Sequence, residues 1–171
     1  MNANTIPYGD PSFCISPERI RHMHGVAELM QEYAVDFECT RSADCYLIGL
    51  LHDIGYIDGK EEHEETGCRI LAGHLVSGEK DLIAHCIRWH SAVPTEYMQE
   101  NQCTADDIPK ELILLWWADM MVESEGEHAG DVVGYQGRLT GLEKRYGMLS
   151  PQYRTCREKI AWLTEYIAAR L

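Results

Sequence analysis

Histidine and aspartate side chains recur along this chain on helical faces that are otherwise apolar, and this pattern restricts the folds open to it. The residues concerned are His22, His52, Asp53, His63, His90 and Asp119. Packing these faces into one core buries imidazole and carboxylate groups, and an unpaired charge in an apolar interior is prohibitively costly. A divalent cation held among them would satisfy all six, so the pattern predicts a metal site in the core of a helical protein.

Apolar residues repeat with the period of an α-helix over most of the chain, and alternating strand-like runs are few. The predicted helices run from Ser16 to about Phe37, from Ser42 to near Gly55, from Glu62 to Leu75, from Glu79 to Ser91, through Glu111 and Asp119, and from Ser150 to Leu171. The polar stretch 95–107 is interpreted as a long loop, a candidate lid. Glycines at 126, 130, 134, 137 and 141 are expected to break the chain.

The length of 171 residues is that of one ordinary domain. We expect an irregular arm over 1–15 and a single domain over 16–171. Within that domain, 16–124 would form the core that carries the metal site, and 137–171 would form the C-terminal helices. The predicted fold class is all-α.

The net charge of −13, from 15 basic and 28 acidic side chains, would repel a polyanion and argues against a nucleic-acid polymer as partner. A small anionic substrate fits if a metal or local basic residues offset this field. No run approaches the ~20 apolar residues of a membrane span. Seven cysteines, an odd number without a CxxC pair, favour a reducing cytoplasm. We therefore expect a cytoplasmic protein with no membrane partner.

Helix geometry separates inward histidines from outward ones. His22 shares a face with Val26 and Leu29, whereas His24 lies on the polar face of Glu28. The first helix is therefore expected to bury His22 and to leave His24 in solvent.

The same geometry selects among the later histidines. His90 lies on an apolar face, and His85 is rotated away from it by roughly 140°. His63 and His74 share a face but lie roughly 16 Å apart, too far for one metal centre. His63, only eleven residues after His52, is the expected ligand.

Asp119 lies in the middle of an apolar stripe with Leu115 and Trp116. His52 and Asp53 close the most hydrophobic predicted helix at its C-terminal end, where partial negative charge favours a cation. Each residue also has a structural alternative, such as a histidine bonded to a carbonyl or a carboxylate paired with a buried arginine. Six such residues over five segments are hard to explain independently.

Read in order, these residues form a pattern over roughly 16–124 that resembles the HD-domain metal-dependent phosphohydrolases. It consists of Arg19-x-x-His22, Leu50-Leu51-His52-Asp53-Ile54-Gly55, His63-x-x-x-Gly67, Ile87-x-x-His90 and Ala118-Asp119. Within that superfamily it looks most like the bacterial branch that cleaves symmetrical dinucleoside polyphosphates. That branch usually has a lysine a few residues after the His-Asp pair, where this chain has Tyr56.

The resemblance implies an HD-domain helical bundle that holds one or two divalent ions in its core. Its mononuclear ligand set would be His22, His52, Asp53 and Asp119. The addition of His63 and His90 permits a dinuclear centre bridged by Asp53. Such mixed ligands suit iron, which we expect first, and also manganese, nickel, cobalt or zinc.

The implied reaction is hydrolysis of a phosphate ester or anhydride of a small molecule, expected to be a nucleotide, by a metal-activated hydroxide. Asp53 would be the catalytic residue. Arg19, Lys60 and Arg88 are the candidates for contacts with the remaining phosphate oxygens. A homodimer stays an open alternative for the assembly.

Two other functions are compatible with the same residues. Related HD-type proteins with the same six ligands are mixed-valent di-iron oxygenases, and the ligand set does not separate the two reactions. A non-catalytic HD module that binds a nucleotide is the third interpretation, which the complete ligand set disfavours.

Overall fold

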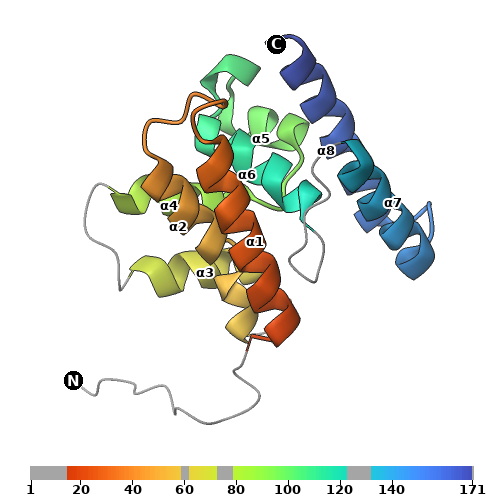
Figure 1. Cartoon of the computed structure of the whole chain (residues 1–171), viewed down its shortest axis with the longest axis horizontal. Helices are drawn as coiled ribbons and strands as arrows, with labels where there is room; N and C mark the ends of the chain where they lie inside the picture. The colour runs from red at the N-terminus through yellow and green to blue at the C-terminus, as the bar shows by residue number, and fades with distance from the viewer. Residues whose placement is uncertain (1–14, 59–61, 73–78, 123–131, 171) are drawn as a thin grey trace.

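The computed structural model describes residues 15–58, 62–72, 79–122 and 132–170, and this part of the chain is helical without a β-strand (Figure 1). The α-helices are α1 (Pro17–Tyr33), α2 (Ser42–Leu51), α3 (His63–Ala72), α4 (Glu79–Trp89), α5 (Pro94–Asn101), α6 (Lys110–Met121), α7 (Val132–Tyr146) and α8 (Pro151–Ala168), and the 3₁₀ helices are η2 (Ile54–Asp58) and η3 (Ala105–Asp107). The predicted all-α class is confirmed. None of the described helices has the length and apolar character needed to cross a lipid bilayer.

Two helices begin at the Ser-Pro pairs where the sequence predicts them. The Ser16 side chain accepts a hydrogen bond from the Arg19 amide at 3.2 Å, and Pro17 occupies the first turn of α1. Ser150 caps α8 in the same way. The first helix ends at Tyr33, short of the predicted Phe37, because the chain then turns and Glu38 adopts a φ of 59°.

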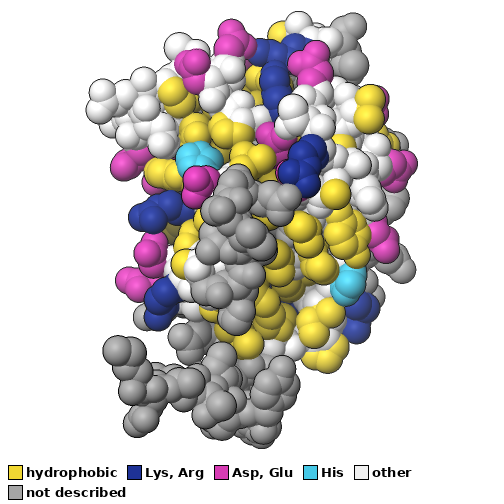
Figure 2. Space-filling model, turned by 90° about the vertical axis from the view of Figure 1, so that its left-hand side faces the viewer, with side chains coloured by type: hydrophobic (Ala, Val, Ile, Leu, Met, Phe, Trp, Pro, Cys, Tyr) yellow, Lys and Arg dark blue, Asp and Glu magenta, His cyan; other side chains and the backbone are white. Residues whose placement is uncertain are grey.

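The core is built around α6, which packs against α1, α2, α4, α7 and α8. Almost every residue of α6 is buried, and Trp116 is fully enclosed, with its indole N–H donating to the Trp89 carbonyl at 2.9 Å. In Figure 1, α7 and α8 lie together at one side of the bundle, away from α3 and α4. The opposite side, seen in Figure 2, presents apolar side chains between charged ones of both signs.

The predicted loop over 95–107 is wrong, because this stretch folds into α5 and η3. Pro94 occupies the first turn of α5 and so begins a helix. The Tyr97 ring is buried edge-on against Trp89 and Trp116, with centroid separations of 5.3 and 5.8 Å. This packing fixes the segment in the core and does not fit the candidate lid.

The predicted chain break is also wrong over part of its length, because positions 134, 137 and 141 lie inside α7. A single glycine costs a helix only about 1 kcal/mol, which the packing of α7 against α6 and α8 can offset. The glycines at 126 and 130, and residues 1–14 of the predicted arm over 1–15, fall outside the described residues.

Candidate metal centre

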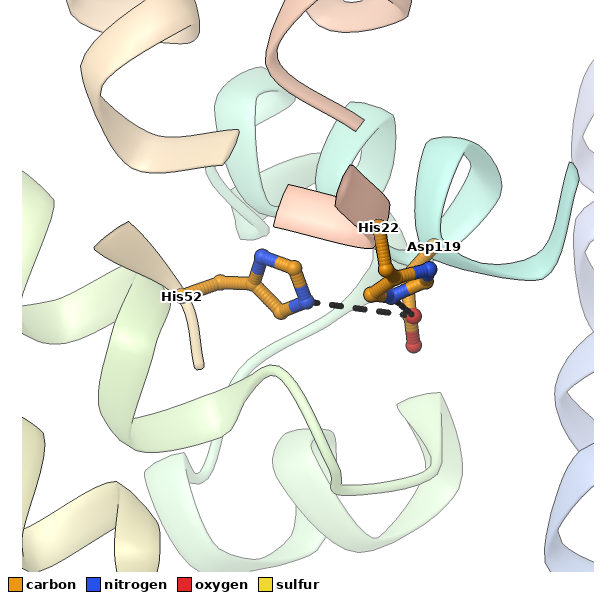
Figure 3. Close-up of side chains that lie close together, drawn as sticks. All are labelled: His22, His52 and Asp119. Carbon is orange, nitrogen blue, oxygen red and sulfur yellow. Dashed lines mark hydrogen bonds and ion pairs between the residues drawn. The ribbon is translucent and has the colours of Figure 1, made fainter. Parts of the chain in front are cut away.

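The first group of site residues is formed by His22 on α1, His52 at the C-terminal end of α2 and Asp119 on α6 (Figure 3). Both imidazole rings point at the Asp119 carboxylate. Its Oδ1 lies 3.0 Å from His22 Nε2 and 3.9 Å from His52 Nε2. All three residues are buried, and one ligand atom from each lies within 4.8 Å of the others. This spacing suits a single cation.

The hydrogen bonds of His52 provide a test of whether a cation fits. Its Nδ1–H donates to the Gly49 carbonyl at 2.7 Å, which leaves Nε2 turned toward the Asp53 and Asp119 carboxylates. Nε2 is buried, with no hydrogen-bond partner among the described residues. A proton there finds no acceptor in good geometry, whereas a cation would meet two carboxylates and an imidazole. A backbone carbonyl behind the ring is typical of a metal-binding histidine.

The second group consists of Asp53, His63 and His90, all buried and also within 4.8 Å of one another. The Nε2 atoms of His63 and His90 are 3.2 Å apart, and His90 Nε2 lies 3.3 Å from Asp53 Oδ1. His90 Nδ1–H donates to the Ile87 carbonyl at 2.6 Å, so its Nε2 also faces the group. The donor set of two imidazoles and one carboxylate can hold a divalent ion.

Asp53 joins the two groups. Its Oδ1 faces His90, while its Oδ2 lies 3.3 Å from His52 Nε2 in the first group. Burial would raise the pKa of the Asp53 carboxyl, but the positive charges that His52 and His90 can carry hold that pKa well below its usual range. Asp53 is therefore ionised and able to bind a cation. Divalent ions could take the place of the protons on His52 and His90 as the positive charges that balance it.

Glycines allow close contact between the segments that carry the two groups. A Cβ atom on Gly49 would lie 2.6 Å from Ala27 Cα, so α1 and α2 approach only because position 49 has no side chain. Gly55 packs against the backbone of His63 in the same manner. A Cβ atom on Gly67, one turn after His63, would lie 3.0 Å from the Ile87 side chain. The space beside Gly67 is therefore occupied by a side chain of α4.

A cavity of about 600 Å³ opens beside the first group. His22 and the acids Glu18 and Asp119 line it, together with four basic side chains, which are Arg19, Arg138, Arg145 and Lys159. This concentration of positive charge contrasts with the net charge of −13 for the chain. A cavity of this kind favours an anionic ligand.

The basic side chains contact the metal-site residues. Arg19 Nη1 lies 2.6 Å from Asp53 Oδ2, and its guanidinium group lies 4.3 Å from the Tyr56 ring centroid. Arg138 Nη2 is 3.5 Å from Asp119 Oδ1. The buried Lys159 donates to the His90 carbonyl at 2.8 Å, and burial lowers its pKa to about 8.

The structure brings all six predicted ligands together and places Arg19 beside them. His24 is exposed, as its position on the polar face of the helix predicts, and His85 bonds to the Tyr97 hydroxyl away from the centre. Arg88 forms an exposed ion pair with Glu65 and does not line the cavity, which does not support its predicted role. The predicted substrate contact Lys60 and the rejected His74 lie outside the described residues.

The sequence reasoning missed the basic residues of α7 and α8. Lys159 lies on the buried face of α8, three residues after Cys156 and four before Leu163. The test applied to histidines, a polar side chain within an apolar stripe, would have found it. Arg138 lies within the predicted C-terminal helices at 137–171, and only the packing of α7 beside α6 brings it to Asp119.

Comparison with known proteins supplies an independent view of the same residues. The family model described as HD domain matches residues 19–121, more than half of the chain, and this segment contains both ligand groups. No curated protein and no solved structure matches the chain. HD domains bind divalent metals, in agreement with the paired histidine and aspartate groups. On the matched segment and its all-α architecture, the chain belongs to the HD-domain family of metal-dependent phosphohydrolases.

Proposed function

We propose that the protein is a metal-dependent phosphohydrolase that cleaves a phosphate ester or anhydride of a small molecule, with a nucleotide as the expected class of substrate. The observation that carries the proposal is the position of Asp53. Its two carboxylate oxygens face two separate histidine groups, next to a cavity lined by four cations. This arrangement supports a dinuclear centre beside an anion-binding space.

The metal chemistry follows from the donor set. When bound, one or two divalent ions would supply an activated water and positive charge for phosphoryl oxygens. Iron is the metal we expect first, with manganese, nickel, cobalt and zinc as alternatives. Ligands for one ion would come from His22, His52 and Asp119, and those for the other from His63 and His90. Asp53 would serve both.

The protein's own residues would bind and orient the substrate. The Arg19 guanidinium, next to Asp53 and above Tyr56, would hold a phosphate oxygen through a charge-assisted hydrogen bond. His52 and His90 each donate through Nδ1 to a backbone carbonyl, which fixes the direction of both rings. Such fixed groups need little rearrangement when charge develops on the phosphate.

The test combines elemental analysis of freshly purified protein with a phosphate-release screen over mononucleotides, dinucleoside polyphosphates and sugar phosphates. We expect bound transition metal and release of phosphate from at least one class. Asp53→Ala should abolish release and lower metal content. His24→Ala, at an exposed position of α1, is the matched control and should leave both unchanged.

Two experimental outcomes would contradict the proposed hydrolase and support another function. A mixed-valent di-iron signal in EPR with substrate-dependent oxygen uptake, and no phosphate release, would identify an oxygenase that uses the same six ligands. Protein that neither holds metal nor gains turnover from added metal would identify a non-catalytic binding module.

A further inference from the structure

The wall of the cavity that faces the metal centre is formed by α7 and α8, which lie beyond the matched segment 19–121. The side chains that α7 contributes follow the spacing of one helical face. They are Gly137, Arg138, Gly141, Leu142, Arg145 and Tyr146, which recur every three to four residues. One face of α7 thus presents two cations, one aliphatic and one aromatic side chain, and two glycines to the cavity.

Lys159 of α8 supplies a buried cation to the same wall. Its side chain is 2% exposed and lines the cavity, and its hydrogen bond within the described ranges goes to the neutral carbonyl of His90. No described carboxylate lies within 4.0 Å of its ammonium group, in contrast to Arg19 and Arg138. A buried ammonium group without a counter-ion is costly, and an anion in the cavity would relieve that cost.

Gly141 is unusual because packing does not require it. A Cβ atom at this position would meet nothing within 4 Å, and the residue lies in the middle of a helix, where glycine is unfavourable relative to alanine. Gly49 and Gly55 differ, since a Cβ on either would overlap neighbouring backbone. Glycine at position 141 therefore leaves space in the cavity, and the packing of the neighbouring residues does not depend on it.

We propose that α7 and α8 recognise an organic phosphate, with its phosphoryl group between the metal centre and the cations Arg138 and Lys159. Its organic part lies over Gly141, against Leu142 and the half-exposed Tyr146. The placement of the phosphoryl group rests on the proposed function. The cavity volume of about 600 Å³ is far larger than a phosphate ion needs and lies in the range of small-molecule sites.

The cationic part is tested by the binding of inorganic phosphate, measured by calorimetry on metal-loaded protein and again after chelation of the metal. Lys159→Met and Arg138→Gln should each weaken binding about tenfold or more, because a hydrogen bond to a charged partner is lost. Arg157→Met is the matched control on the exposed face of α8 and should bind as the parent does. Unchanged affinity in Lys159→Met and Arg138→Gln would overturn the assignment.

The organic part is tested at Gly141 with a panel of nucleoside, sugar and aryl monophosphates, again measured by binding. At least one member should bind more tightly than inorganic phosphate. Gly141→Phe should remove that gain, at least tenfold, and leave the affinity for inorganic phosphate unchanged. Gly141→Ala, which adds one methyl group, should have a much smaller effect. The melting temperatures of both variants should show that they are folded.

The outcomes separate this inference from the proposed function. Binding that is equal for all organic phosphates and for inorganic phosphate, or that is unaffected by Gly141→Phe, would overturn the role of α7 while metal-dependent phosphate release still stood. The opposite result is also possible: the parent protein releases no phosphate, but its binding of organic phosphates still depends on Lys159 and Gly141. The proposed phosphohydrolase activity would then be wrong, and the site for an organic phosphate would still stand.

Discussion

Gly55 packs against the carbonyl group of His63 so closely that a Cβ atom at position 55 would overlap the carbonyl oxygen. Gly55 lies in η2, two residues after Asp53, and His63 begins α3. This contact joins the segment that carries Asp53 to the helix that carries His63. The absence of a side chain at Gly55 thus helps to bring the residues of the second group together.

Gly55→Ala should therefore destabilise the fold and disturb the second group. The added methyl group must push η2 and α3 apart, and overpacking of this kind costs about 1–3 kcal/mol. Urea unfolding should report the lost stability, and elemental analysis should report a lower metal content. Stability and metal content equal to those of the parent would show that the contact is not needed.

Gly141→Ala should have the opposite effect on stability. The position lies inside α7, and the added methyl group meets no atom within 4 Å, so the helix gains about 0.5–1 kcal/mol from the change. Urea unfolding of the two proteins side by side measures this gain. A loss of stability would mean that α7 requires glycine at 141 for packing.

Removal of metal should lower the stability of the parent. Two carboxylates and four imidazoles are buried together at the centre, and a cation bound only by the folded state stabilises it by about 3 kcal/mol at a hundredfold excess over Kd. Thermal unfolding with and without a chelator should show a drop of several degrees. Asp53→Ala should respond less to the chelator, and an equal response would count against the ligand role of Asp53.

Tyr56 stands between Arg19 and His63. Its ring centroid lies 4.3 Å from the Arg19 guanidinium carbon and 4.2 Å from the centroid of the His63 ring. Tyr56→Leu should lower kcat/KM for phosphate release by about two- to fivefold, because the cation–π contact that orients Arg19 is lost. Tyr56→Phe keeps the ring and should retain the parent value. If phenylalanine were as damaging as leucine, the hydroxyl group would be the important part.

The inward direction of the candidate ligands could be predicted from the sequence because each lies on, or directly after, a helix rich in apolar residues. His22 and His24 are two residues apart, yet helical rotation places one in the core and the other in solvent. The same rotation distinguishes His90 from His85. Which residues face inward is thus a local property, readable without knowledge of the neighbouring helices.

The cavity could not be predicted in this way because it depends on how distant helices pack. Arg88 and Arg138 are equally basic in the sequence, but Arg88 lies on an exposed face beside Glu65 and Arg138 reaches Asp119 from α7. The helix at 94–101 was missed for a local reason. Pro94 can end one helix or begin the next, and the burial of Tyr97 decides for the second.

The number of metal ions bound per chain decides whether Asp53 joins the two groups into one dinuclear centre. Elemental analysis of protein reconstituted with iron or manganese should give two ions per chain. His22→Ala and His63→Ala should each retain about one, and Asp53→Ala should lose both. A single ion in the parent that survives His63→Ala and His90→Ala unchanged would contradict the dinuclear centre.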